Sequence, residues 1–461
     1  MEDFDHLRAL NNRSNWLPYQ NHIHVLADIP GLRLHRQSDV RGDYMKQLTK
    51  PIMPTCRFCG THLKQNVVDL GMSPLANSYL RADQLHRMEP FYPLRVFVCS
   101  ECLLVQAEDF ESPESIFEDY AYFASYSDTW LQHAKNYAAM AINRFSLNST
   151  SRVIELASND GYLLQYFVER GVPVLGIEPA ANVAEYALKN SIPTLVKFFG
   201  TATAAELASQ GVQADLLVGN NVLAHVPKLN DFVEGMKIVL KPLGVITMEF
   251  PHLMRLVQDN QFDTIYHEHF SYFSLLAVEQ LFAAHGLALF DVEELSTHGG
   301  SLRIYASHVD DASKPISQRV IDLRGSEQAM GLGTLAYYQC FSEKVKVTKY
   351  KLLDFLIGAK SGGKMIVGYG APAKGNTLLN YCGIRSDFLD YTVDRSPHKQ
   401  EHFLPGTHIP IYHPDKIKET KPDYVLILPW NLKNEVMAQM EFIRSWGGQF
   451  VVPIPEVQIL P

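Results

Sequence analysis

The sequence predicts an α/β protein with two open, doubly wound sheets and a small cysteine-bearing segment. Three observations support this prediction. Short apolar runs alternate with helical patterns from about residue 126, as expected of buried parallel strands and their crossover helices. The same alternation begins again after residue 308. Ahead of both stretches lie two Cys-x-x-Cys pairs, Cys56 with Cys59 and Cys99 with Cys102.

Size and composition are those of a globular protein with several domains. A chain of 461 residues is too long for one ordinary domain. The formal charge of −9 gives no general attraction for nucleic acid. No window approaches the roughly 18 to 20 uninterrupted apolar residues that span a membrane, and the acidic start at Met1–Asp5 does not read as a secretory signal. We therefore expect a cytoplasmic protein without nucleic-acid or membrane partners.

Four segments are expected along the chain. Residues 1–50 are polar and irregular, and we expect a tail to which no role is assigned. Residues 51–125 are expected to form a metal-binding domain around the cysteines. Residues 126–308 and 309–461 are expected to form the two α/β domains.

The individual elements follow from hydrophobic periodicity. The metal-binding segment should contain short strands at 67–71 and 91–98. The first α/β domain should contain, in order, a helix at 127–144, a strand at 153–156, a helix through 166–168, a strand at 174–178, a helix through 183–187, and strands at 215–219 and 245–250. The second should contain one helix at 317–359, strands at 364–370, 389–394 and 423–428, a helix at 434–446 and a strand at 450–452.

The two cysteine pairs indicate a zinc site. Structural Zn²⁺ takes four thiolate or imidazole ligands in a tetrahedron. In a long chain without a secretory signal, such pairs favour a metal over disulfides. Four protein ligands leave no open coordination position, so we expect a structural zinc. The candidate ligands are Cys56, Cys59, Cys99 and Cys102.

A cofactor-binding turn is expected after the strand at 153–156, because ligands bind at the carboxyl ends of the strands in such sheets. The turn has too few glycines for a dinucleotide loop and better resembles the first motif of class I S-adenosylmethionine (SAM) methyltransferases. Glu178, at the next strand end, is placed to accept hydrogen bonds from ribose hydroxyls. A Rossmann-like domain with another ligand, or with none, is the alternative. The candidate cofactor-binding residues are Glu155, Ala157, Ser158, Asn159, Gly161, Glu178, Pro179, Asn220, Asn221 and His225.

Downstream lies a run of titratable side chains, Tyr266-His267-Glu268-His269. A neutral imidazole can accept a proton near neutral pH, and a carboxylate beside it can hold its tautomer. If the run is a strand, the two histidines share one face, whereas a loop imposes no such sorting. The density of these groups beside a cofactor domain favours a catalytic role over solvated loop histidines.

A second glycine-rich turn, Gly368–Thr377, follows an apolar strand and opens a helix. The free N–H groups of a helix start suit a phosphate, and Lys374 adds a cation. The turn is not a Walker loop. Its glycine spacing, with Asp394 downstream, is tolerated by dinucleotide-binding domains, so an NAD oxidoreductase is an open alternative. The candidate substrate-binding residues in this domain are Lys374, Asn376, Arg395 and Lys399.

Together these motifs resemble the SAM-dependent sugar C-methyltransferases of deoxysugar biosynthesis. The resemblance covers about residues 53–457 and rests on six stretches: the Cys56–Cys59 pair, 74–77, 155–161, 266–271, 297–303 and 368–375. It implies a zinc-binding domain, a class I methyltransferase domain that binds SAM, and a C-terminal α/β domain that helps to hold a nucleotide-sugar. It also implies methylation at C3 of a dTDP-4-keto-6-deoxyhexose.

The resemblance further implies roles for individual residues. His269 matches the base that removes the proton beside the ketone, and His267, two residues before it in the same run, is a further catalytic candidate. Tyr266 and Glu268 would orient this base or stabilise the enolate oxygen. Tyr79 and His298 would line the sugar pocket.

Two other readings share parts of this pattern. An O- or N-methyltransferase acting on a nucleotide-sugar would use the same scaffold without abstracting a proton from carbon. A zinc-containing RNA methyltransferase would need a basic stripe with interleaved aromatic residues, which the sequence lacks.

Overall fold

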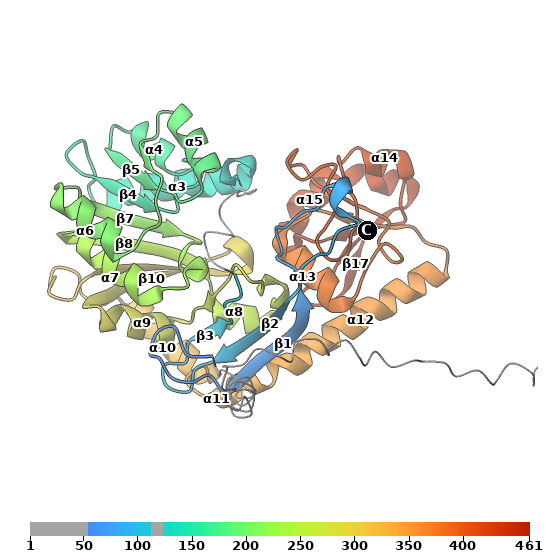
Figure 1. Cartoon of the computed structure of the whole chain (residues 1–461), viewed down its shortest axis with the longest axis horizontal. Helices are drawn as coiled ribbons and strands as arrows, with labels where there is room; N and C mark the ends of the chain where they lie inside the picture. The colour runs from blue at the N-terminus through green and yellow to red at the C-terminus, as the bar shows by residue number, and fades with distance from the viewer. Residues whose placement is uncertain (1–53, 112–122) are drawn as a thin grey trace, which may run out of the picture. The chain divides into compact units, whose positions relative to one another are not determined.

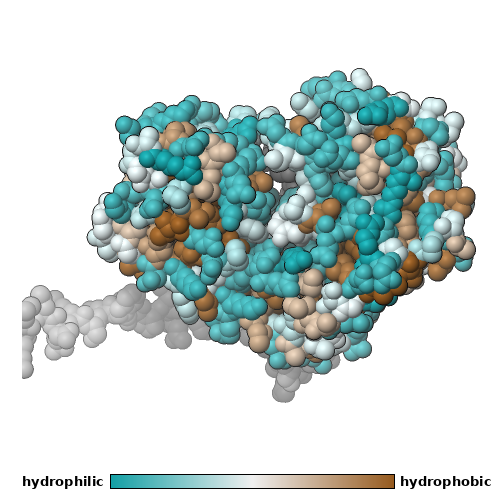
Figure 2. Space-filling model, turned by 180° about the vertical axis from the view of Figure 1, so that it is seen from behind, coloured by the Kyte–Doolittle hydropathy of each residue, from teal (hydrophilic) through white to brown (hydrophobic). Residues whose placement is uncertain are grey.

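Three β-sheets organise the part of the chain that the structure, a computed structural model, describes: residues 54–111 and 123–461 (Figure 1). The expected tail at 1–50 lies outside these residues, as does part of the expected metal-binding domain at 51–125. In the described ranges, no helix combines the length and the apolar character that a membrane span requires. The face shown in Figure 2 is mostly hydrophilic and carries separate apolar patches.

The first sheet carries the cysteines and has four antiparallel strands in the order β1-β2-β3-β9. Three of its strands come from the cysteine-bearing segment (blue in Figure 1), and the fourth follows the Tyr266–His269 run. This last strand pairs Ser271 with Gln106 and Tyr272 with Val105. The strands are β1 (Gln65–Ser73), β2 (Tyr92–Val98), β3 (Val105–Ala107) and β9 (Ser271–Tyr272).

The buried side chains of the cysteine-bearing segment divide between two hydrophobic cores. Val67 and Val96 belong to the core that is built mainly from residues 338–454. Cys99 and Leu104 belong to the core of the seven-stranded sheet. The segment therefore packs its apolar side chains against both α/β domains, because it is too small to enclose a hydrophobic core of its own.

The second sheet has seven strands in the order β10-β11-β8-β7-β4-β5-β6. All pair in parallel except β11, which is antiparallel to both neighbours. The strand order reverses between β4 and β7, which opens a crevice at their carboxyl ends. The strands are β4 (Val153–Leu156), β5 (Val174–Ile177), β6 (Thr194–Leu195), β7 (Ala214–Asn220), β8 (Leu240–Pro251), β10 (Leu287–Leu295) and β11 (Ser301–His308).

Helices connect these strands. The first, α3, begins where the Ser127 hydroxyl accepts a hydrogen bond from the Trp130 amide at 3.3 Å, which satisfies one of the free N–H groups of its first turn. The helices are α3 (Asp128–Arg144), α4 (Leu164–Val168), α5 (Ala181–Lys189), α6 (Thr201–Ser209), α7 (Leu229–Val239), α8 (Leu253–Gln258) and α9 (Leu275–Ala284).

The third sheet has six strands in the order β14-β13-β12-β15-β16-β17, parallel except for β17. It is a second open α/β sheet, as the sequence predicts. The strands are β12 (Ile366–Tyr369), β13 (Thr392–Val393), β14 (Ile411–Tyr412), β15 (Tyr424–Ile427), β16 (Gln449–Val452) and β17 (Gln458–Leu460), with helices α13 (Ala373–Cys382), α14 (Lys416–Thr420) and α15 (Lys433–Gln439).

Two expected helices are interrupted. The single helix predicted at 317–359 is three helices, α10 (Gln318–Met330), α11 (Leu335–Gln339) and α12 (Phe341–Ser361). The prediction was wrong because Gly331 adopts φ +94° and ends α10 with a left-handed cap, a conformation that glycine adopts without strain. The helix predicted at 434–446 is α15 followed by a 3-10 turn. Helix α12 runs beside β1 (Figure 1).

Glu327 of α10 ties this helix to the end of the seven-stranded sheet. Its carboxylate is fully buried and accepts the amides of Leu275 at 2.7 Å and Leu276 at 2.9 Å at the start of α9. The same carboxylate accepts from Nε2 of His252 at 2.7 Å. One buried acceptor therefore fixes both the entry to α9 and the residue that precedes α8.

Glu327→Gln should lower the free energy of unfolding by about 1–3 kcal/mol, because glutamine has one acceptor oxygen and leaves a buried donor unpaired. Chemical denaturation measures the difference. The matched control is Glu279→Gln, which breaks a partly exposed pair between α9 and Arg324 of α10 and should cost under about 1 kcal/mol. Equal losses in the two variants would contradict a special role for the buried carboxylate.

Candidate active site and metal centre

A cavity of about 1420 Å³ opens at the carboxyl ends of β4, β5 and β7. Residues of the cysteine-bearing segment and of the C-terminal α/β domain complete its wall. Ordinary small-molecule pockets measure roughly 300–1,000 Å³, so this cavity has room for two ligands together. The predicted residues on its wall are Ala157, Asn159, Glu178, Pro179, Asn220, Asn221, His225, Tyr266, Glu268, His269, His298, Lys374 and Lys399.

Part of the predicted cofactor loop supports the turn and does not face the cavity. Ser158 lies under β5, where a Cβ on Gly176 would be 2.3 Å from its hydroxyl oxygen. Gly161 has φ +81°, and a Cβ there would lie 3.0 Å from Ile192. Glu155 is buried below the turn, and burial raises the pKa of its carboxyl well above the usual range. Ala157 and Asn159, from the same turn, line the cavity.

Glu178 and Asn220 present polar atoms to the cavity from neighbouring strand ends. The Glu178 carboxylate accepts the amides of Asn159 at 2.9 Å and Ala180 at 2.8 Å, and burial raises its pKa to about 7. Neither amide atom of Asn220 has a partner among the described residues, although both are buried. Buried polar atoms normally have partners, and a ligand in the cavity would supply partners for this amide. A carboxylate at the end of β5 suits the ribose hydroxyls of SAM, and the amide suits its polar groups.

The Tyr266–His269 run is a loop with a turn at His267 and Glu268. His269 is 9% exposed and its ring hydrogen-bonds at both nitrogens. Nδ1 lies 2.7 Å from the carbonyl oxygen of Thr264, which can only accept, so Nδ1 carries the proton. Nε2 then holds the free lone pair and accepts from the Tyr266 hydroxyl at 2.8 Å. The ring is a proton acceptor whose tautomer is fixed by the backbone.

Burial and two neighbouring rings keep this imidazole neutral. Burial is the largest cause that lowers the pKa of His269 well below its usual range, and His225 adds to it. The His225 and His269 ring centres lie 4.7 Å apart. Burial also lowers the pKa of His225 and of His298 to about 4. All three rings are therefore uncharged at neutral pH.

Glu268 is held by a residue from the cysteine-bearing segment. The Asn77 amide donates to both carboxylate oxygens, at 2.7 and 2.9 Å. Burial raises the pKa of Glu268 to about 7. Asn77 lines the cavity and was missed as a site residue, although it belongs to the 74–77 stretch that resembles the family. Trp130, at the start of α3, also lines the cavity and gave no sequence signal.

His267 does not face the cavity. Nε2 of its ring lies 3.1 Å from the Pro93 carbonyl oxygen, and the ring packs edge-on between Tyr92 and Phe110. The turn after Tyr266 rotates His267 away from its neighbours. In the structure its ring packs against Phe110, which lines the cavity, and the expected catalytic role of His267 stays a prediction.

Two residues of the C-terminal domain present cations to the cavity. The Lys374 ammonium donates to Asn431 at 2.8 Å and lies 4.6 Å from the centre of the Trp430 ring, and burial lowers its pKa. Lys399 donates to the Ala371 carbonyl at 2.9 Å. His298, which also lines the cavity, adopts φ 54°, a strained backbone for this residue type.

Three other predicted substrate residues lie off the cavity wall. Asn376 is buried and donates to the Ala76 carbonyl at 2.6 Å. The Tyr79 hydroxyl donates to the Ala371 carbonyl at 2.5 Å. Arg395 is half exposed, 3.8 Å from Asp128. The first two fasten the cysteine-bearing segment to the turn at 370–376, because each donates to a backbone carbonyl across these two parts of the chain.

The glycine-rich turn after β12 is held by its neighbours. Asp394 accepts the amides of Ala371 at 2.7 Å and Ser396 at 2.8 Å, so its carboxylate fixes the backbone of this turn. A Cβ on Gly370 would lie 2.6 Å from Pro429. The glycine thus serves the close approach of two loops.

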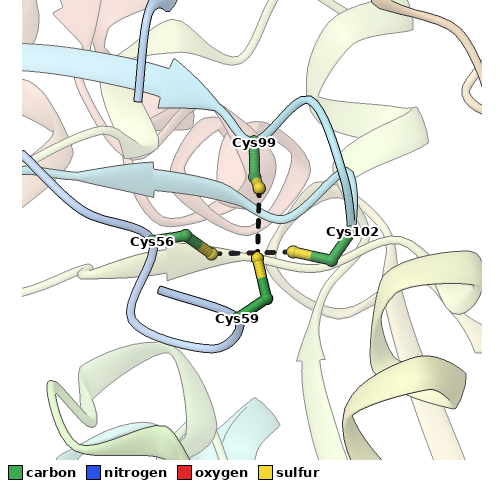
Figure 3. Close-up of side chains that lie close together, drawn as sticks. All are labelled: Cys56, Cys59, Cys99 and Cys102. Atoms are coloured by element: carbon green, nitrogen blue, oxygen red, sulfur yellow. Dashed lines mark hydrogen bonds between the residues drawn. The ribbon is translucent and has the colours of Figure 1, made fainter. Parts of the chain in front are cut away.

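The four cysteines converge on one point (Figure 3). Their sulfur atoms all lie within 4.8 Å of one another, with Cys56 and Cys102 at 3.6 Å and Cys59 and Cys99 at 3.4 Å. Tetrahedral Zn–S bonds of about 2.3 Å place sulfurs about 3.8 Å apart. The cluster therefore fits Zn²⁺ in a closed, structural site.

Cys99→Ser should lower the zinc content and the yield of soluble protein, because a hydroxyl is a poor substitute for a buried thiolate ligand. Elemental analysis of the purified protein measures the first. Cys340→Ser, at an exposed cysteine outside the cluster, is the control and should keep the metal. Unchanged zinc in the Cys99 variant would remove that residue from the ligand set.

Glu268→Gln should change how stability depends on pH. The folded-state pKa of about 7 lies above the unfolded value of about 4.3, so the stability that Glu268 contributes is complete below pH 4.3 and is lost as the pH rises through about 7. Glutamine does not titrate. The free energy of unfolding of the unmodified protein, relative to the variant, should fall between pH 5 and pH 8 in denaturant titrations. A constant difference would contradict the raised pKa.

Family models match three consecutive parts of the chain. One described as a putative zinc binding domain matches residues 56–117. One described as a methyltransferase domain matches residues 130–292. One described as a C-methyltransferase C-terminal domain matches residues 296–455.

Individual proteins agree with these matches. C-methyltransferase NovU of Streptomyces niveus is 34% identical over 417 residues, which cover 90% of this chain and 99% of NovU. A ubiquinone biosynthesis O-methyltransferase of Bartonella bacilliformis is 26% identical over 126 residues, 26% of this chain and 51% of that protein. Among solved structures, the CcbJ methyltransferase of Streptomyces caelestis aligns with 43% of this chain and 99% of its own at 12% identity, with a TM-score of 0.33, which supports no structural inference.

The seven-stranded sheet with its crevice, the cysteine cluster and the near full-length likeness to NovU lead to one conclusion. The chain belongs to the SAM-dependent C-methyltransferase family and combines a structural zinc site with a class I methyltransferase fold.

Proposed function

We propose that this enzyme transfers a methyl group from SAM to C3 of a nucleotide-linked 4-keto-6-deoxy sugar, through an enolate that His269 generates. The observation that carries the proposal is the fixed tautomer of His269, whose Nε2 is the unprotonated ring atom in the cavity and accepts a hydrogen bond from the Tyr266 hydroxyl. A neutral imidazole also serves to deprotonate a hydroxyl, so the choice of carbon over oxygen is supported by the likeness to C-methyltransferases.

His269 would take the proton from the carbon beside the ketone. The C–H bond electrons pass into the ring carbon–carbon bond, the ketone oxygen becomes an enolate oxygen, and the proton goes to Nε2. The lowered pKa of His269 keeps the ring in its basic form over the physiological range, since the neutral form is the one that accepts. Bound SAM supplies an electrophilic methyl group that the enolate carbon can attack.

Tyr266 has a second use in this scheme. Its hydroxyl donates to Nε2 of His269 in the ligand-free enzyme. That hydroxyl must turn away from Nε2 before the lone pair can take the substrate proton, and it can then donate to the enolate oxygen. Lys374 and His298 face the same cavity and supply a positive charge and a further ring N–H. Such preorganised donors act where the negative charge develops.

The size and the charges of the cavity support a nucleotide-linked substrate. The cavity has room for SAM and a second large ligand. Lys374 and Lys399 lie on its C-terminal side, where a diphosphate would find cations near the start of α13. We therefore propose that residues 126–308 bind SAM and that residues 309–461 bind the nucleotide part, as in a dTDP-sugar. A cytoplasmic location follows from these two substrates.

His269→Gln should abolish turnover while SAM still binds, because the base is lost but the residues at the ends of β5 and β7 are untouched. The assay uses dTDP-4-keto-6-deoxyglucose carrying deuterium at C3. The unmodified enzyme should replace that deuterium with solvent hydrogen, and the variant should not. Mass spectrometry of the sugar and calorimetric titration of SAM provide the two readings.

His267→Gln is the matched comparison, since the same substitution two residues earlier alters a ring that faces away from the cavity. It should keep most of the turnover. Retention of deuterium at C3 during methylation by the unmodified enzyme would indicate transfer to a heteroatom and would refute the enolate. Loss of SAM binding in the His269 variant would assign that residue to the fold.

A further inference from the structure

The side chain of Arg57 links the zinc site to the loop of the proposed base. Arg57 lies between two zinc ligands, Cys56 and Cys59. Its side chain is 9% exposed and runs inward from the turn at 56–59, which we call the zinc knuckle. The guanidinium donates to the backbone carbonyls of Phe270 and Ala107, and it lies 5.3 Å from the centre of the Phe270 ring.

Phe270 is the residue directly after His269, and its backbone is held at both ends. The Phe270 amide donates to the Ala224 carbonyl at 2.8 Å. The Phe270 carbonyl accepts from the Ala107 amide at 3.0 Å and from Arg57. With the base loop fixed on this side by Arg57, and on the other by the His269–Thr264 hydrogen bond, the ring of His269 has little freedom to move.

The backbone of Arg57 is linked to the metal ligands by hydrogen bonds through Gln106. Its amide donates to the side-chain oxygen of Gln106 at 3.0 Å. The Gln106 amide group donates to the sulfur of Cys56 at 3.2 Å. Gln106 is buried and belongs to β3, the strand that pairs with β9 after the base loop. The position of the Arg57 backbone therefore follows the geometry of the cysteine cluster.

We propose that Arg57 is a positioning residue for the methyl transfer, through which the zinc knuckle holds the loop that presents His269 to the substrate. The inference deepens the proposed function and rests on it. The cysteine-bearing segment has no separate core among the described residues, so the metal sets the shape of the knuckle, and Arg57 carries that shape to the loop at 264–272. On this account the zinc is bound only by protein ligands, and it affects the rate of methyl transfer through the position of Arg57.

A purely structural role for Arg57 predicts something different. If Arg57 only stabilised the segment, its removal would lower the zinc content and the stability. Turnover would then fall no further than after removal of another arginine of the same segment. A positioning role predicts a loss in kcat at unchanged affinity for both ligands, because the ground-state contacts of SAM and of the nucleotide lie elsewhere on the wall. A misplacement of about 1 Å can reduce a rate by roughly 100-fold.

The test compares Arg57→Met and Arg57→Lys with Arg95→Met. Arg95 belongs to the same segment, pairs with Glu108 and has a 41% exposed side chain, so it controls for the loss of an arginine. Four quantities are measured on the full chain: the zinc content, the Kd of SAM, kcat and KM with dTDP-4-keto-6-deoxyglucose, and backbone hydrogen exchange in residues 264–272.

Arg57→Met should retain zinc and SAM affinity, exchange faster in residues 264–272, and lose roughly 10- to 100-fold in kcat with little change in KM. Arg57→Lys should recover part of the loss, because lysine can still donate to one carbonyl. Arg95→Met should match the unmodified enzyme in all four. If Arg57→Met does not fold, the lysine variant, with an intermediate kcat, decides the question.

Two results would overturn the proposal. One is a full kcat and unchanged exchange in both Arg57 variants. The other is loss of zinc, or faster exchange throughout the chain, which would make Arg57 a folding residue. Failure of the proposed function is a separate result, since the unmodified enzyme would then leave the keto-sugar unchanged while hydrogen exchange at 264–272 still reported on Arg57.

Discussion

The hydrogen bond between Nδ1 of His269 and the carbonyl of Thr264 is the constraint on which the rest of the site depends. A carbonyl oxygen can only accept, so the bond fixes the tautomer and leaves Nε2 as the basic atom. It also requires the chain at 264–269 to fold back on itself as a loop, because a strand would carry this carbonyl away from the ring. Turning the loop in this way sends His267 to the other side and brings Glu268 to Asn77.

Burial has one common effect on the charged groups around this loop. It lowers the pKa of the three cavity histidines and of Lys374, and it raises the pKa of Glu178 and Glu268. Each shift favours the uncharged form. These shifts reduce the charge on this part of the wall, so a charge that forms during a reaction interacts strongly with nearby donors. In the proposed mechanism, an enolate would find such donors in Tyr266 and Lys374.

The cysteine-bearing segment is held in position by the parts of the fold that pack against it. Its side chains enter two cores that belong to the α/β domains, and β9, from the far side of the base loop, completes its sheet. Asn77 and Arg57 then reach from this segment to the loop, one to a carboxylate and one to a backbone carbonyl. Metal, loop and cavity wall are consequently parts of one packed unit, and a disturbance at one is expected to reach the others.

The sequence by itself determined the fold class, the four zinc ligands and most of the long parallel strands, because these depend on local spacing and hydrophobic periodicity. The sequence predicted neither the hairpin β10–β11 nor the break at Gly331. A strand face that mixes polar and apolar residues gives a weak hydrophobic periodicity, and a single left-handed residue hardly changes that of a helix. The sequence also did not determine the direction of each side chain in the cofactor turn and in the base loop. Ser158 and His267 lie off the cavity wall, whereas Asn77 and Trp130 line the cavity. Only the tertiary structure decided these, because they are set by contacts between segments that lie far apart in the chain, such as Asn77 with Glu268 and Arg57 with Phe270.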